Sequence, residues 1–322
     1  MRKWLKRFRG NHIIWILLLM VVVYYILGQI LGVLLLWPFL KLTKRFSAVF
    51  FVLYNYGLFI GDVLILVGYC LLFRKNRFIL GAFLPAGRSL PHREAVPEDA
   101  YEPTRNNTPQ MLLLGLGLGF LMNFFCIACA LLHGDIKLDL SFSAAELPVL
   151  LFAFFWVFVQ SSSEELWCRG FLYERVNIHY PLWATILVNA LLFGALHLLN
   201  DGISVLAIVD IVLCGFAYSL LRWYTGSLWA VMGLHTMWNF TQNFLFGLPN
   251  SGLVSEFSVL HLDAANGTSN LIYDYAFGVE GAFPAILVDA SLVILVLLLA
   301  RRDGRLGELW QSYETRAAAK EE

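Results

Sequence analysis

Long apolar stretches alternate with short polar connections along most of this chain. A membrane-spanning helix needs about 20 mainly apolar residues, and eight stretches have that length and character. The pattern therefore predicts an all-α fold, a polytopic transmembrane helical bundle of about eight spans, in a single membrane domain covering residues 1–322. The expected spans are 13–38, 48–73, 111–132, 147–168, 182–199, 203–221, 227–247 and 282–300.

Basic residues predict how this bundle is oriented, because loops rich in Lys and Arg stay on the cytosolic side of a membrane. With the N-terminus in the cytosol, nineteen of the 23 Lys and Arg residues lie at cytosolic positions. The first apolar stretch is too long for a cleavable signal peptide, so we expect it to remain as an anchor. Both termini are then cytosolic. The four outer basic residues are Lys41, Lys44, Arg45 and Lys137.

Three polar segments interrupt or follow the spans. Residues 78–109 contain Pro85, Pro91, Pro97, Pro103 and several charges, which predicts a cytosolic linker and not a folded domain. Residues 248–281 would form an outer loop, and residues 301–322 a cytosolic tail.

Composition supports a membrane protein and narrows its partners. The chain is 59% hydrophobic and 14% charged, whereas a soluble domain carries roughly 25% charged residues. We therefore expect an integral membrane protein whose surroundings are a lipid bilayer. The net charge of zero argues against a nucleic-acid partner. All five cysteines lie in apolar segments, which predicts small buried side chains and not a disulfide framework.

Two adjacent carboxylates in the fourth apolar stretch are the first candidate for chemistry. An ionisable side chain at membrane depth costs about 2.5–3.5 kcal/mol even on lenient scales. Glu165 and Arg169 are four residues apart, so they share a helix face and can pair. Glu164 points about 100° away and lacks such a local partner. A free, desolvated carboxylate suits a general base, although the group could also be an ion-pair cluster that ties helices together.

Two later apolar stretches carry further polar residues at helical spacing. Phe193 and His197 share a face, as do His235 and Asn239. Each pair alone could serve packing or hydrogen bonding between helices. Polar groups in a bilayer must satisfy one another, and all of these fall within one hundred residues of the carboxylates. The set therefore indicates one shared site.

The motifs Glu164-Glu165-x-x-x-Arg169, Phe193-x-x-x-His197 and His235-x-x-x-Asn239, in this order, resemble the CPBP family. That family comprises CAAX prenyl endopeptidases of the Ras-converting type and bacteriocin-processing proteins, and it is also called the Abi family of intramembrane proteases. The resemblance covers residues 146–247, which would be the catalytic core helices.

The resemblance implies a membrane-embedded protease, a hydrolase acting on peptide bonds of a peptide or membrane-protein substrate. Glu164 would activate the attacking water with help from His197. His235 and Asn239 would hold the oxyanion of the tetrahedral intermediate. Glu165 and Arg169 would order the motif, with Phe193 as a further supporting residue.

The sequence leaves metal dependence and activity open. Members of the family are often called metalloproteases, and Glu164, His197 and His235 could ligate zinc in a three-ligand site. No His-Glu-x-x-His helix is present, and we prefer a metal-independent glutamate mechanism. The alternatives are a catalytically silent relative that acts as a membrane scaffold or immunity protein, or a small-solute transporter using Asp62, Asp210 and Asp289. We expect a bacterial cell membrane as the location.

The expected site makes a geometric demand. At 1.5 Å per helical residue, Glu164 and His235 lie within about 15 Å of the cytosolic face, but His197 lies near the outer end of its helix. We expect the turn at residues 200–202 to be sunk into the protein beside a wet cavity. The four side chains, including Asn239, should then lie within about 10 Å of one another, around one cavity open to the cytosol.

Overall fold

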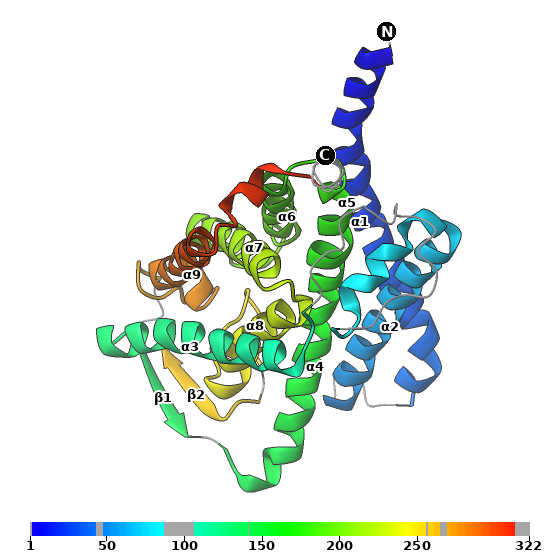
Figure 1. The fold of residues 1–322 in the computed structure, drawn as a ribbon. Coiled ribbons are helices and arrows are strands. Elements are labelled where there is room, and N and C mark those ends of the chain that lie inside the picture. Colours follow the sequence, from blue (N-terminus) through cyan, green and yellow to red (C-terminus); the bar gives the residue numbers. More distant parts are fainter. Residues whose placement is uncertain are drawn as a thin grey trace.

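Helices dominate the structure, a computed structural model that describes residues 2–42, 48–86, 106–140, 142–255, 257–264 and 269–312. Each of the eight expected spans coincides with a helix, so the all-α membrane fold is confirmed (Figure 1). The helices are α1 Arg2–Leu40, α2 Ala48–Leu72, α3 Pro109–His133, α4 Leu147–Glu165, α5 Tyr173–Asn177, α6 Leu182–Leu196, α7 Val205–Thr225, α8 Leu228–Phe240 and α9 Phe283–Arg302.

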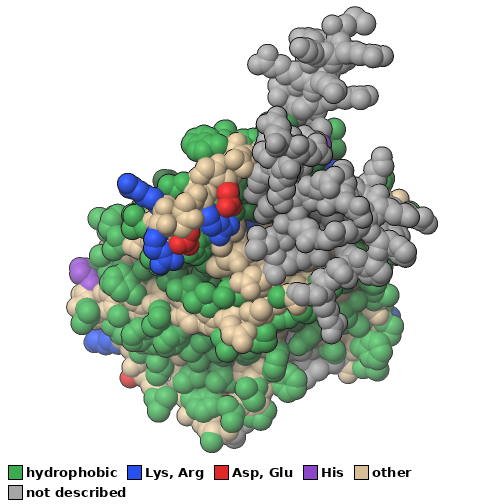
Figure 2. Space-filling model, viewed as in Figure 1, with side chains coloured by type: hydrophobic (Ala, Val, Ile, Leu, Met, Phe, Trp, Pro, Cys, Tyr) green, Lys and Arg blue, Asp and Glu red, His purple; other side chains and the backbone are tan. Residues whose placement is uncertain are grey.

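The described residues contain five helical stretches that are long and apolar enough to cross a membrane. The helices α6 and α8 are shorter, with 15 and 13 residues. Large apolar side chains cover much of the face shown in Figure 2, and charged side chains gather near the end of α9. Such a surface is stable against lipid and not against water, so the chain is an integral membrane protein. The five stretches are Trp15–Leu40, Pro109–His133, Leu147–Asn177, Val205–Thr225 and Phe283–Arg302.

Glycines bring α1 and α2 into direct backbone contact. A Cβ placed on Gly32 would lie 2.0 Å from the carbonyl oxygen of Gly57, and one on Gly61 would lie 1.9 Å from that of Gly28. Small residues spaced by four allow close helix approach in membranes, where lipid tails leave little hydrophobic force between helices. The antiparallel pair lies along one side of α4 in Figure 1, and Ser163 of α4 donates a hydrogen bond to Asp62 of α2.

A second glycine contact fixes α8, which carries His235 and Asn239, against α3. A Cβ on Gly115 would lie 1.9 Å from the carbonyl oxygen of Ala230. Along the interface the residue numbers of the contacting positions rise together in both helices, so α3 and α8 run parallel. The N-terminus of α8 is capped by Asn107, whose Oδ1 accepts bonds from the backbone N–H groups of residues 228 and 229 at 2.8 and 3.2 Å. The depth of α8 is therefore set at its first turn and along one face.

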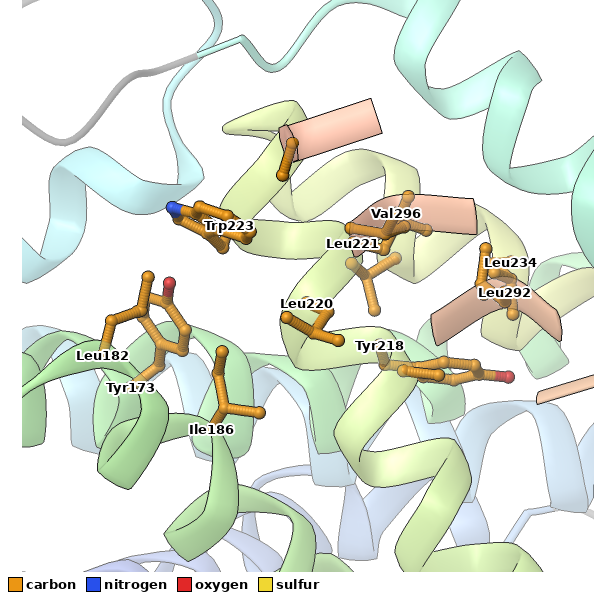
Figure 3. Close-up of a cluster of buried hydrophobic side chains, with 13 residues drawn as sticks. Tyr173, Leu182, Ile186, Tyr218, Leu220, Leu221, Trp223, Leu234, Leu292 and Val296 are labelled. Atoms are coloured by element: carbon orange, nitrogen blue, oxygen red, sulfur yellow. The ribbon is translucent and has the colours of Figure 1, made fainter. Parts of the chain in front are cut away.

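A hydrophobic cluster fills the space between α5, α6, α7 and α9 (Figure 3). Tyr173 and Leu182 lie on one side of α7, and Leu292 and Val296 of α9 lie on the other. On the charge-derived orientation these are the cytosolic halves of the helices. Apolar packing therefore closes that end of the bundle.

The connections contain structure that the apolar pattern does not predict. Strands β1 Ile136–Leu140 and β2 Leu260–Ala264 form an antiparallel pair, so the expected outer loop 248–281 includes a strand. Within the expected linker 78–109, a 3-10 helix, Arg74–Phe83, leads to Ala86, whose N–H donates to the carbonyl oxygen of Asn107 at 3.0 Å. Residues 87–105 and residues 313–322 of the expected tail lie outside the described residues.

Candidate active site

Both helices that carry the main motifs change their winding directly after the polar residues. Glu165 is the last residue of α4, and a π-helical turn, Leu166–Leu172, carries Arg169 and joins α4 to α5. Likewise α8 ends at Phe240, one residue after Asn239, and a π-helical turn, Thr241–Leu245, follows. Single π turns inside α-helices recur at functional sites, because they re-aim side chains without breaking the helix.

The pair predicted from spacing is present and lies in the protein interior. Arg169 Nη1 donates to Glu165 Oε1 at 2.9 Å, and both side chains are fully buried. Arg169 also donates to the carbonyl oxygen of Gly215, and its guanidinium stacks 4.3 Å from the ring centroid of Phe193. Phe193 thus supports the cation of the motif directly, which gives the residue a physical reason to be aromatic.

Glu165 links this pair to α8, which lies 70 residues further along the chain. His235 Nδ1 lies 2.9 Å from Glu165 Oε1, and a carboxylate accepts, so Nδ1 carries the proton. The other ring nitrogen, Nε2, lies 3.9 Å from Glu164 Oε2. His235 is therefore held between the two adjacent carboxylates.

Glu164 is the more accessible of the two carboxylates, with 20% of its side chain exposed. Gln160 Nε2 donates to Glu164 Oε1, so Glu164 has a local partner one turn back, which the sequence analysis did not predict. Glu164 Oε2 has no hydrogen-bond partner among the described residues. One oxygen is thus anchored, and the other faces His235.

His197 lies directly after α6, where its Nδ1 is 2.8 Å from the carbonyl oxygen of Phe193. A carbonyl only accepts, so Nδ1 donates, and in the neutral imidazole Nε2 is then the acceptor. The Phe193 ring lies near both histidine rings, with centroid distances of 4.7 Å to His197 and 5.9 Å to His235. The sequence places His197 at the far end of its helix, and in the structure this histidine and His235 share one aromatic neighbour.

Asn239 lies one turn beyond His235 on α8 and is buried. Its Nδ2 donates to Ser161 Oγ of α4 at 3.5 Å, and its Oδ1 accepts from Asn250 Nδ2 at 3.2 Å. Asn250 belongs to the segment after α8, outside the motifs.

All four expected catalytic side chains line one cavity of about 800 Å³. Phe193 also lines it, as does Asn200 of the turn that the sequence predicts to be sunk into the protein. Asn200 Nδ2 donates to the carbonyl oxygen of Ser251 at 3.2 Å, so this turn packs against the loop after α8.

The cavity wall extends to the start of α4 and to the loop after α8. Its wall includes Val149 and Phe152 at the start of α4, and Val254 and Phe257 of the expected outer loop. Among the described residues, none from the connection between α5 and α6, or from that between α7 and α8, lines it. On the charge-derived orientation these wall residues lie towards the non-cytosolic face, whereas the hydrophobic cluster of Figure 3 lies in the cytosolic halves of the helices.

Three acidic residues that the motifs do not include also line the cavity: Asp210, Glu280 and Asp289. Asp210 and Asp289 enter the sequence analysis only through the transporter alternative, and Glu280 does not enter it at all. Burial raises the pKa of Glu280 above its ordinary value, and hydrogen bonds from Ser251 and Trp238 act in the opposite direction. One signal could have found it, namely an acidic residue among the apolar and small residues of 275–285.

The residues do not form a metal site in this arrangement. Among the described residues, no three His, Cys, Asp or Glu side chains are placed so that they could hold a metal ion. The Nδ1 atoms of His197 and His235 are both engaged, with Phe193 and Glu165. Both Nε2 atoms remain available, and a histidine that ligates a metal through Nε2 commonly donates from Nδ1 in this way, so these hydrogen bonds do not exclude Glu164, His197 and His235 as ligands.

Comparison with known proteins agrees with the motifs. A family profile, described as Type II CAAX prenyl endopeptidase Rce1-like, matches residues 146–241. The comparison with curated proteins gave no match, and neither did the comparison with solved structures. The matched residues run from the start of α4 to the end of α8 and include every motif residue. Residues 146–241 are therefore similar to the Rce1-like family of type II CAAX prenyl endopeptidases, in line with the family that the motifs resemble.

Proposed function

We propose that this chain is an intramembrane endopeptidase that hydrolyses peptide bonds with a glutamate-activated water. One observation carries the proposal: His235 is fixed by Glu165 at one nitrogen and presents the other to the free oxygen of Glu164. The cavity wall also includes His197 and Asn239. The cavity therefore holds a base and hydrogen-bond donors close to one another.

Glu164 is suited to the base because its Oε2 is unpartnered and its surroundings are largely apolar. It would accept a proton from water as the oxygen of that water bonds to the peptide carbonyl carbon. The same proton then passes from Glu164 to the peptide nitrogen, and the carbon–nitrogen bond breaks to give a carboxylic acid and an amine. His197 Nε2, an acceptor, would help to hold the water.

His235 and Asn239 would stabilise the oxyanion that forms on the carbonyl oxygen. With carboxylates next to both ring nitrogens, His235 can carry a proton on Nε2 as well as on Nδ1 and donate from Nε2. Asn239 Nδ2 would be the second donor. Removing one such donor typically lowers kcat by about 10²–10³.

Cleavage by the purified protein in lipid vesicles tests the proposal. Peptides with a fluorophore and a quencher report hydrolysis directly, and the set should include neutral and basic sequences. The reason is that the cavity wall contains Glu164, Asp210, Glu280 and Asp289, and no Lys or Arg among the described residues. A scaffold or immunity protein would cleave none of them, and a transporter would instead move a solute across the vesicle membrane.

Metal removal is expected to leave activity unchanged. No three His, Cys, Asp or Glu side chains among the described residues are grouped as metal ligands, and the mechanism above uses the carboxylate of Glu164 alone as the base. The measurement is cleavage after treatment with a strong chelator, together with elemental analysis of the purified chain. One zinc per chain, lost with activity and regained on zinc addition, would contradict the mechanism and assign Glu164, His197 and His235 as ligands.

The substrate is expected to enter from the non-cytosolic face, because the cavity wall reaches the loop after α8. Val254 lines the cavity with 67% of its surface exposed, so a membrane-impermeant maleimide should label Val254→Cys in intact cells. Gly307→Cys, after α9, offers a matched control, because a Cβ there meets no other atom within 4 Å. It should react only after permeabilisation. Labelling in the reverse order would place the opening in the cytosol.

A further inference from the structure

We propose that Glu280, acting through Asn250, sets the direction in which the Asn239 amide points. The inference rests on the proposed function, in which Asn239 Nδ2 donates to the oxyanion. Asn250 and Glu280 both lie outside residues 146–241, the part of the chain that matches the family profile. They are positioning residues, since they contact Asn239 and its neighbour and not the reacting atoms.

An asparagine side chain has an acceptor end and a donor end of nearly equal shape. Only the donor end stabilises an oxyanion, and the oxygen of a flipped amide would repel it. Among the described residues, Asn239 Nδ2 has one hydrogen-bond contact, a long one of 3.5 Å to Ser161 Oγ, and a hydroxyl can donate as well as accept. Ser161 therefore does not determine which way the amide points.

The other end of Asn239 does have a partner of fixed character. Asn250 Nδ2 donates to Asn239 Oδ1 at 3.2 Å and to Glu280 Oε1 at 2.9 Å. An ionised carboxylate only accepts, so the NH₂ group of Asn250 must face Glu280. The second hydrogen of that NH₂ group then meets Asn239, which must turn its oxygen towards Asn250 and its own NH₂ group away.

Glu280 is itself held in place by donors. Trp238 Nε1 donates to Glu280 Oε1 at 2.8 Å, and the backbone N–H and the hydroxyl of Ser251 donate to Oε2, each at 2.8 Å. The indole and backbone N–H groups have no acceptor character, so both carboxylate oxygens are acceptors in this arrangement. Trp238 precedes Asn239 on α8, so the carboxylate is tied to the helix that it orders.

The test is a double-mutant cycle on cleavage by the full chain in lipid vesicles. Asn250→Asp keeps the shape but replaces the donor with an acceptor, so Asn239 turns its NH₂ group towards residue 250. We expect kcat to fall about as far as in Asn239→Ala, by about 10²-fold, with KM changed less than about threefold. The double variant Asn239→Ala/Asn250→Asp should be no slower than Asn239→Ala alone, because both changes remove the same donor.

Asn243→Asp is the matched control. Asn243 Nδ2 donates to the carbonyl oxygens of Leu248 and Leu253 at 3.1 and 2.9 Å, so the change disturbs the same loop without touching the Asn239 amide. In the double variant Asn239→Ala/Asn243→Asp, the loss of kcat should equal the product of the losses in the two single variants, because the two changes act independently. Glu280→Gln offers a second route, since it removes the fixed acceptor and should lower kcat in the same non-additive way.

Two results would overturn this inference and leave the proposed function standing. The first is a double variant whose loss of kcat equals the product of the losses in Asn250→Asp and Asn239→Ala. The second is an Asn250→Asp variant with the kcat of the wild-type chain. A merely structural role would lower folded yield and melting temperature in step with activity, and both are measured for each variant. Absence of cleavage by the wild-type chain would overturn the proposed function, and this inference with it.

Discussion

Glu164→Gln is expected to lower cleavage by a factor of about 10² or more, with the protein still inserted and folded. The amide matches the carboxylate in size, and Gln160 can still hydrogen bond to its oxygen. What disappears is the group that accepts the proton of the water. The measurement is kcat on a quenched fluorescent peptide, with the melting temperature in detergent as the check on folding.

Glu146→Gln is the matched control for this change. Glu146 lies before α4, where its side chain accepts from the backbone N–H of Ser143 in a capping box, and glutamine also serves in that motif. It does not line the main cavity, so kcat should stay within about twofold, as for most surface changes. If Glu164→Gln cleaved as fast as the wild-type chain, Glu164 would not be the base, and the scaffold alternative would become the better explanation.

Glu165→Gln is expected to destabilise the fold. The change leaves the guanidinium of Arg169 fully buried without its counter-ion, and breaking a buried ion pair by removing one partner costs about 3–5 kcal/mol. It also weakens the acceptor that holds His235 Nδ1. Folded yield and melting temperature should both drop clearly below those of the wild-type chain.

Arg302→Gln provides the comparison, because its partner Asp303 is a surface residue and the ion pair is solvent-exposed. Exposed pairs contribute little, so yield and melting temperature should not change measurably. A Glu165→Gln variant as stable as Arg302→Gln would mean that Gly215 and the aromatic rings beside Arg169 compensate for its charge without the carboxylate.

The sequence by itself determined the helices and one ion pair of the site. A bilayer requires each span to be long, apolar and internally hydrogen-bonded, so the eight apolar stretches could hardly form anything but helices. The Glu165–Arg169 pair follows from the spacing of four residues within one segment. Neither conclusion depends on how the helices pack against each other.

Contacts between segments were beyond the reach of such local rules. The spacing rule leaves His197 at the far end of its helix, and only the packing of α6 against α7 places Phe193 and His197 on the same cavity wall as the other motif residues. The π-helical turns after Glu165 and Asn239 also leave no mark in the apolar pattern.

The tertiary structure alone decided what surrounds the motifs and where their cavity opens. Asn250 hydrogen bonds to Asn239, and Glu280 accepts a hydrogen bond from Asn250. Both residues belong to a segment whose sequence is typical of an ordinary polar loop. The glycine contacts that fix α8 against α3 are made between backbones 115 residues apart in the sequence at Gly115 and Ala230. Hydropathy measures how each residue interacts with lipid. It contains no information about the end of the bundle at which the helices pack closely together.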